Sequence, residues 1–297
     1  MAPDGQSLVF ATPDGMTLRG VCWGVGPDPV VFTQGNGFAV QCYGPALHSL
    51  WPRIRLHALN SRGHGGSDAP ASYPNWDGPL SDLRAYVRAT FSAPVFLAGH
   101  SFGASLSLRL AAESPELVAG LLLLEPLLVA GRNETWPPST EGYMAELIAR
   151  TRERRDGWAD RAEALAWLRT RAAYRDWAPE ALRAFVASGL VDGAGGGVRL
   201  ACPPWLEAEG YATLPGPVMH DWVRKVRVPT VILRAEGSPV VSPQALEEVL
   251  AAIPVAVRMN VKGSHSFPME HPRAAGEALA LGMDILLRAR DGAAAGL

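Results

Sequence analysis

The chain has 297 residues, of which 48% are hydrophobic and 19% charged, so it can bury an ordinary core and is not expected to be disordered. Its formal net charge of −2 offers no basic field for a phosphate backbone, so we do not expect nucleic acid as a partner. Three cysteines without a Cys-x-x-Cys pair give no disulfide framework, and the N-terminus lacks the features of a signal peptide. Because no apolar run is long enough to span a bilayer, we expect a cytoplasmic protein without a membrane partner.

The first predicted element is a β-hairpin, in which residues 8–11 and 17–22 flank the turn sequence Pro-Asp-Gly. After it, short apolar runs alternate with helical patterns, as in a parallel sheet that is buried on both faces. The predicted strands are residues 30–32, 54–56, 95–98, 121–124, 230–234 and 255–261, and the predicted helices are residues 80–91, 102–113, 243–253 and 272–287. This order predicts an α/β fold with a doubly wound, mostly parallel sheet.

Residues 131–226 have no buried-strand pattern. Instead, residues 141–155, 161–173 and 179–188 have the spacing of amphipathic helices, and a glycine-rich turn follows them. We interpret this stretch as a helical cap inserted into a sheet domain made of residues 1–130 and 227–297. Six tryptophans fall within the cap, at positions 136, 158, 167, 177, 205 and 222; they either pack the cap or line an apolar pocket beneath it. The arginines at 150, 152, 154 and 155 are interpreted as a solvated helix face.

A nucleophile elbow is predicted at residues 99–103, where Gly-His-Ser-Phe-Gly fits the pattern Gly-x-Ser-x-Gly between a predicted strand and a predicted helix. Such an elbow holds its serine in a strained conformation, and its neighbours must be small because strand and helix pass close by. This context predicts Ser101 as a nucleophile. The alternative is a structural serine in a tight turn.

Three further segments complete a resemblance to the α/β-hydrolase superfamily that covers nearly the whole chain. Residues 34–37, Gln-Gly-Asn-Gly, resemble its oxyanion loop, and residues 61–67 resemble its Arg-Gly-x-Gly-x-Ser signature. Residues 263–267, Gly-Ser-His-Ser-Phe, followed by Glu270 and Pro272, resemble its catalytic-histidine loop. The resemblance implies the α/β-hydrolase fold and a capped, esterase-like serine hydrolase that needs no metal and no organic cofactor.

The resemblance also assigns roles to particular residues. The backbone N–H groups of Asn36 and Phe102 would form the oxyanion hole, with that of Phe102 at the positive end of its helix. His265 would take the Ser101 proton and later deliver it to the leaving group. His100 adjoins the nucleophile in sequence, but its side chain should point elsewhere if the elbow is real.

The acid of the triad is absent from the position that the resemblance implies, because Ser238 stands where an aspartate is expected. We predict Glu125 as the acid, since a carboxylate directly after the apolar run 121–124 is costly unless it is paired or functional. Some branches of the superfamily carry their acid after this strand. Glu236 is the alternative acid, and a further alternative is that Glu125 only caps or salt-bridges the first cap segment.

These residues predict hydrolysis of a carboxylic ester of an apolar small molecule through an acyl-enzyme on Ser101. Amide, thioester, lactone and carbon–carbon bond hydrolysis remain alternatives, because the fold does not choose among them. A ligand-binding module with little turnover is a hypothesis from another class, motivated by Ser238. The sequence does not indicate an oligomeric state.

Overall fold

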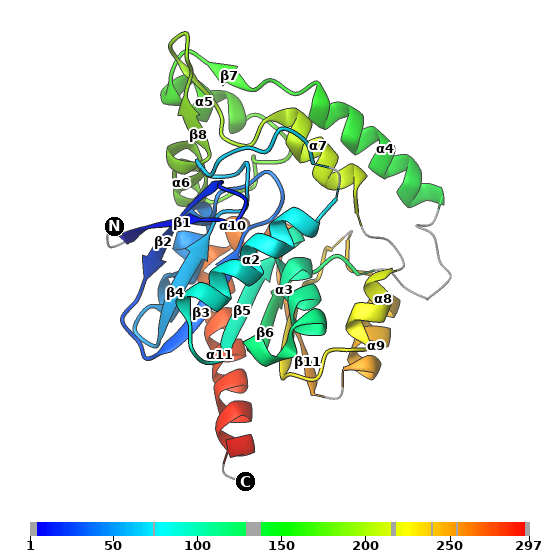
Figure 1. Ribbon diagram of the computed structural model, residues 1–297. Helices are drawn as coiled ribbons and strands as arrows, with labels where there is room; N and C mark the ends of the chain where they lie inside the picture. The colour runs from blue at the N-terminus through cyan, green and yellow to red at the C-terminus, as the bar shows by residue number, and fades with distance from the viewer. Residues whose placement is uncertain are drawn as a thin grey trace.

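An eight-stranded sheet in the order β1-β2-β4-β3-β5-β6-β10-β11 forms the centre of the molecule (Figure 1). The computed structural model describes residues 5–73, 75–128, 138–214, 218–238, 240–253 and 255–294. β1 (Gln6–Ala11) and β2 (Thr17–Trp23) form the predicted hairpin, and β2 pairs antiparallel with β4 (Ile54–Leu59). From β4 onward every neighbouring pair in this sheet is parallel, so the predicted mostly parallel sheet is confirmed.

The remaining elements of the sheet domain include the predicted strands and helices, together with short helices at residues 40–50, 115–117 and 267–270 that were not predicted. The other strands are β3 (Asp28–Thr33), β5 (Val95–His100), β6 (Val118–Leu124), β10 (Thr230–Ala235) and β11 (Ala256–Val261). The helices are η1 (Val40–Tyr43), α1 (Gly44–Leu47), η2 (His48–Leu50), α2 (Asp77–Thr90), α3 (Phe102–Glu113), η3 (Pro115–Leu117), α9 (Pro243–Ala252), α10 (Phe267–Glu270) and α11 (Pro272–Ala294). Among the described residues, no helix is both long and apolar enough to cross a bilayer.

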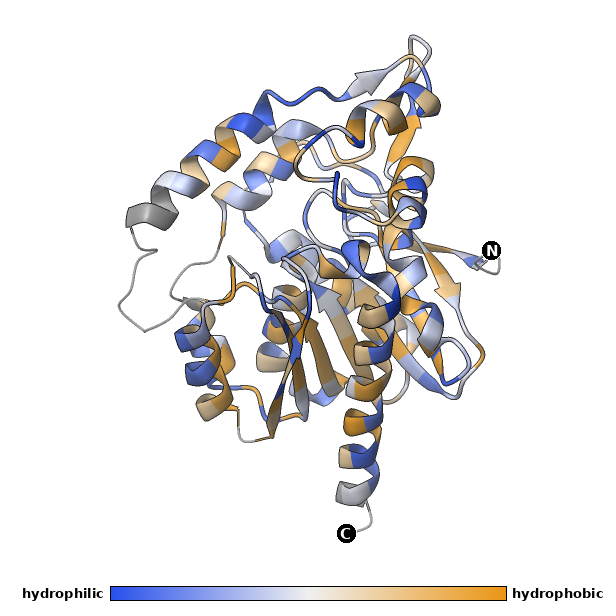
Figure 2. Cartoon of the chain, turned by 180° about the vertical axis from the view of Figure 1, so that it is seen from behind, coloured by the Kyte–Doolittle hydropathy of each residue, from blue (hydrophilic) through white to orange (hydrophobic). Residues whose placement is uncertain are grey.

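Side chains of β6 alternate between two hydrophobic cores, one on each face of the sheet. Leu122 and Leu124 pack in the core that contains α11, whereas Leu121 and Leu123 pack in the core that contains α2 and α3. None of these four leucines is more than 1% exposed, and full burial of one such side chain is worth about 1.5–3 kcal/mol. Burial on both faces explains the unbroken apolar run. Figure 2 shows that the hydrophobic colour, orange, is frequent in the strands of the central sheet.

The segment between β6 and β10 contains α4 (Pro138–Arg152), β7 (Gly157–Trp158), α5 (Arg161–Leu168), α6 (Pro179–Ser188), β8 (Leu190–Asp192), β9 (Val198–Leu200), α7 (Pro204–Ala212) and α8 (Val218–Val223). Its elements from α4 to α7 lie over one end of the sheet, whereas α8 packs beside α3 and α9 (Figure 1). The small antiparallel sheet β7-β9-β8 was not predicted, because strands of two or three residues are too short to show a period. The glycine-rich turn joins β8 to β9, and a Cβ at Gly197 would lie 2.4 Å from the Trp158 carbonyl oxygen.

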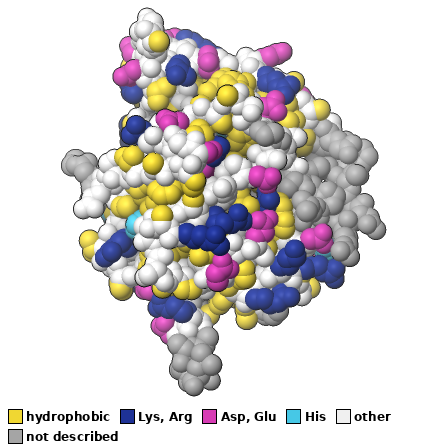
Figure 3. All heavy atoms as spheres, viewed as in Figure 1, with side chains coloured by type: hydrophobic (Ala, Val, Ile, Leu, Met, Phe, Trp, Pro, Cys, Tyr) yellow, Lys and Arg dark blue, Asp and Glu magenta, His cyan; other side chains and the backbone are white. Residues whose placement is uncertain are grey.

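The interpretation of the four arginines as a solvated face is wrong for Arg154. The other three are exposed, and Figure 3 shows basic and acidic side chains interspersed over one face of the molecule. Arg154 lies just beyond the end of α4 at Arg152. There Arg154 forms an ion pair with Glu207 of α7, whose side chain is only 7% exposed. A buried charge of either sign would be costly without its partner.

Candidate active site

Ser101 lies in the sharp turn between β5 and α3. Its backbone has φ 52° and ψ −113°, in the left-handed region that non-glycine residues rarely adopt. Both flanking glycines are required by close contacts: a Cβ at Gly99 would lie 2.4 Å from the Gly103 carbonyl carbon, and one at Gly103 would lie 2.3 Å from the Thr33 carbonyl oxygen. The turn therefore has the geometry that the Gly-x-Ser-x-Gly pattern predicts.

The imidazole of His265 lies between the Ser101 hydroxyl and the Glu125 carboxylate. Its Nε2 is 3.0 Å from Ser101 Oγ, and its Nδ1 is 3.1 Å from Glu125 Oε2. With the carboxylate ionised, Nδ1–H donates to Glu125 and Nε2 is free to accept the serine proton. The arrangement suits a hydroxyl nucleophile, a base that removes its proton, and an anion that stabilises the resulting imidazolium.

Glu125 reaches His265 because β6 lies between β5 and β10 in the sheet. It directly follows β6 with φ 49°, and its side chain is fully buried. The backbone N–H of Ala235 donates to Glu125 Oε1 at 2.7 Å, and the hydroxyl of Ser238 donates to Oε2. With the imidazole, three donors therefore surround this buried carboxylate, which offsets the cost of removing it from water.

Neither position 238 nor position 236, the two other places considered for the acid, provides a carboxylate to His265. Ser238, at the position where the resemblance implies an aspartate, donates to Glu125 and also accepts from the backbone N–H groups of Val240 and Val241. Glu236 has an exposed side chain and, within the described part of the chain, forms no hydrogen bond to His265. The structure thus brings Glu125, and not Glu236, to the imidazole. Sequence reasoning missed that the serine supports the carboxylate.

Two backbone N–H groups beside Ser101, those of Asn36 and Phe102, have no acceptor among the described residues. Their neighbours are all engaged: Gly35 N–H with the Tyr43 hydroxyl at 3.0 Å, Gly37 N–H with His64 Nε2 at 3.0 Å, and Gly103 N–H with the Gln34 carbonyl oxygen at 3.1 Å. Phe102 begins α3, so the helix dipole adds positive potential there. Two free donors beside a nucleophile can receive a developing oxyanion.

The side chain of Asn36 ties this loop to the segment above it. Its Nδ2 donates to the Glu207 carbonyl oxygen of α7 at 2.8 Å. α7 lies so close that a Cβ at Gly210 would be 2.7 Å from Asn36 Nδ2. The position of the predicted oxyanion donor therefore depends on packing against α7, which the sequence pattern did not indicate.

A cavity of about 390 Å³ opens in front of Ser101. Its apolar lining includes Phe38, Trp76, Phe102, Leu127, Tyr143, Met144, Leu147, Trp177, Leu214 and Val240. Of the six tryptophans considered for such a pocket, Trp136 lies outside the described residues, and of the five that the structure describes only Trp177 lines the cavity. Two carboxylates, Asp176 and Glu270, also line the cavity, whereas none of the described lining residues is Lys or Arg.

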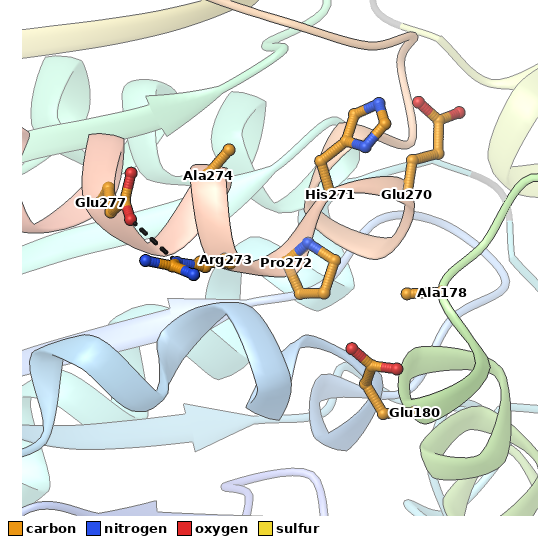
Figure 4. A pocket seen from close by; sticks show the side chains of 8 residues that line it. All are labelled: Ala178, Glu180, Glu270, His271, Pro272, Arg273, Ala274 and Glu277. Carbon is orange, nitrogen blue, oxygen red and sulfur yellow. Dashed lines mark hydrogen bonds and ion pairs between the residues drawn. The ribbon is translucent and has the colours of Figure 1, made fainter.

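Glu270 borders this cavity and also an open hollow of about 570 Å³ at the start of α11 (Figure 4). In that hollow, Arg273 pairs with Glu277. The Glu270 carboxylate accepts hydrogen bonds from the backbone N–H of Ser264, at 2.8 Å, and from its hydroxyl. Glu270 therefore anchors the residue directly before His265.

Two buried histidines near the site predict acid sensitivity of the fold. Burial lowers the pKa of His64 to about 4 and that of His100 well below the ordinary value of 6.5. Below about pH 6.5 the unfolded chain binds protons that the folded chain excludes, so stability falls as the pH falls. We expect the unfolding free energy, measured with urea, to drop between about pH 7 and 5, by about 2 kcal/mol for His64 and by a further amount for His100. A constant value over this interval would contradict the prediction.

Comparisons with known proteins are consistent with this geometry. A model described as the alpha/beta hydrolase family matches residues 23–278. The chain is 27% identical over 223 residues to the 2-(acetamidomethylene)succinate hydrolase of Mesorhizobium japonicum, covering 73% of each protein. It is 31% identical over 140 residues to lipase LipV of Mycobacterium tuberculosis, a match that spans 46% of this chain and only about half (53%) of the lipase. A solved structure of E-2-(acetamidomethylene)succinate hydrolase shares its fold, with a TM-score of 0.81, 24% identity and coverage of 94% of this chain and 99% of that one.

Proposed function

Because the chain belongs to the alpha/beta hydrolase family, we propose that it is a serine hydrolase that cleaves a carboxylic ester of an uncharged, apolar small molecule, with residues 131–226 as a cap over the site. One observation carries the proposal: the hydrogen-bonded series Ser101, His265 and Glu125 lies at an apolar cavity. Many hydrolases that act through a serine use this order of hydroxyl, base and acid.

In the proposed reaction, Ser101 Oγ attacks the ester carbonyl carbon while His265 Nε2 takes its proton. The carbonyl oxygen becomes an oxyanion that accepts hydrogen bonds from the N–H groups of Asn36 and Phe102. Glu125 stabilises the imidazolium, which then protonates the departing alkoxide and leaves an acyl-enzyme. Water, deprotonated by His265, attacks the acyl carbon, and collapse of the second tetrahedral intermediate releases the carboxylic acid and restores Ser101.

The side chains that line the cavity favour an uncharged substrate and disfavour an anionic one. A succinate is a dicarboxylate, and the relative named for such a substrate is 27% identical to this chain over 223 residues. Recognition of carboxylates normally uses Arg or Lys, and among the described residues that line this cavity the charged side chains are Asp176 and Glu270. The hydrogen bond between Glu125 and His265 supports Glu125 as the acid, so the absence of an aspartate at 238 does not favour a ligand-binding module.

The test compares two p-nitrophenyl esters with six-carbon acyl chains, the hexanoate and the monoester of adipic acid, which differ by a terminal carboxylate. We expect kcat/KM for the hexanoate to be higher by about tenfold or more, since a carboxylate in this cavity would be desolvated beside two others. A fluorophosphonate probe should label Ser101, as read by peptide mass spectrometry.

Absence of labelling together with absence of turnover would reject the serine hydrolase. Labelling combined with faster turnover of the adipate ester would reject only the uncharged substrate class.

A further inference from the structure

Three hydrogen bonds, two of them buried and the third partly buried, connect the loop of Asn36 to the loop of His265. The backbone N–H of Gly35 donates to the Tyr43 hydroxyl at 3.0 Å, and that hydroxyl lies 2.7 Å from His100 Nδ1. His100 Nε2 lies 2.8 Å from the backbone carbonyl oxygen of His265. Tyr43 is 1% exposed and His100 is fully buried, and neither lines the cavity.

The direction of this relay is fixed by its two ends. The N–H of Gly35 can only donate, and the carbonyl of His265 can only accept. A neutral His100 ring must carry its proton on Nε2 to donate to the His265 carbonyl, so its Nδ1 accepts from the Tyr43 O–H. The Tyr43 oxygen in turn accepts from Gly35. Burial and the neighbouring His265 lower the pKa of His100 well below its ordinary value, consistent with a neutral ring.

The relay joins the two groups whose relative position matters most in the proposed reaction. Gly35 immediately precedes Asn36, whose free N–H is the expected oxyanion donor. The other end holds the backbone of His265, whose ring touches Ser101 and Glu125. Misplacement of a reacting group by about 1 Å can cost about 10²-fold in rate.

We propose that Tyr43 and His100 are positioning residues that fix the oxyanion loop relative to the imidazole of His265. This inference rests on the proposed serine hydrolase function. The relay transfers no proton to substrate; it sets the distance between two loops that are far apart in sequence. Because neither side chain lines the cavity, removing one of them from the relay should slow the chemical step and leave substrate binding unchanged.

The test replaces Tyr43 by phenylalanine, which keeps the ring that packs edge-on against Phe32 and removes the hydroxyl from the relay. With p-nitrophenyl hexanoate, we expect Tyr43→Phe to lower kcat by about tenfold and to leave KM within about twofold. The rate of fluorophosphonate labelling at Ser101 should fall by the same factor as kcat.

The matched control is Tyr86→Phe. Tyr86 also has a buried ring, and its hydroxyl lies 2.6 Å from His57 Nδ1, a second tyrosine–histidine pair that does not reach the site. Both variants should lose a similar amount of unfolding free energy in urea, but Tyr86→Phe should keep the parental kcat. Equal kcat losses in both variants would show a general effect of destabilisation and overturn the positioning role.

Two further outcomes separate this inference from the proposed function. If the parent is labelled at Ser101 and Tyr43→Phe is labelled at the parental rate with the parental kcat, the positioning role fails while the hydrolase stands. If the parent itself is not labelled, the hydrolase fails and the positioning role with it. Independently of activity, the ¹⁵N spectrum of the parent at about pH 7 should show His100 neutral and protonated on Nε2; a charged ring or an Nδ1–H tautomer would overturn the relay.

Discussion

Replacement of Ser101 by alanine is expected to lower kcat by about 10⁴-fold or more, because in the proposed reaction the hydroxyl oxygen is the atom that forms the acyl-enzyme. Alanine removes one buried oxygen and keeps the backbone turn, which is held by the Ser101 N–H bond to the Leu124 carbonyl oxygen at 2.8 Å. The unfolding free energy should therefore change little. The measurement is the steady-state hydrolysis of p-nitrophenyl hexanoate, with urea unfolding of the same preparation.

A suitable control is Ser49→Ala, since the Ser49 hydroxyl donates to the Gly276 carbonyl oxygen at 2.9 Å and lies outside the residues that line the cavity. This variant should keep the parental kcat. If Ser101→Ala retained kcat within about tenfold of the parent, the nucleophile would have to be another group.

Glu125→Gln is expected to lower kcat by about 10²–10⁴-fold, because the substitution keeps the shape and reverses the hydrogen bonding. Glu125 accepts from Ala235, Ser238 and His265. A glutamine amide must turn its NH₂ group toward at least one of these donors. If the NH₂ faces the imidazole, it donates to Nδ1 and leaves the ring proton on Nε2, so that His265 can no longer accept the Ser101 proton. In addition, no negative charge remains to stabilise the imidazolium.

The comparison is with Glu236→Gln, a change of the same size at the exposed alternative position, which should leave kcat near the parental value. Steady-state kinetics of both variants with one ester distinguish the two acids. Near-parental kcat in Glu125→Gln combined with a large loss in Glu236→Gln would place the acid on the loop after β10.

Local patterns in the sequence determined the order of strands and helices and the position of the elbow. A strand buried on both faces must be apolar at successive residues, as in Leu121 to Leu124, and this requirement is visible without knowing what packs on it. The elbow is visible for a similar reason, since a Cβ at Gly99 or Gly103 would meet backbone atoms. Glu125 stood out because a charged residue directly after such a run is costly unless other groups surround it.

Only the tertiary structure decided which groups surround these residues. Glu125 reaches His265 because β10 is added beside β6, and Ser238 of the following loop then donates to the carboxylate. Two other features also depend on the packing of segments that are distant in sequence. One is the ion pair of Arg154 with Glu207, and the other is the relay from Gly35 through Tyr43 and His100 to His265. A residue's own neighbours in sequence fix its backbone conformation and its burial pattern, whereas a hydrogen bond such as that between His100 and His265, 165 positions apart, exists only once the loops at the end of the sheet are assembled.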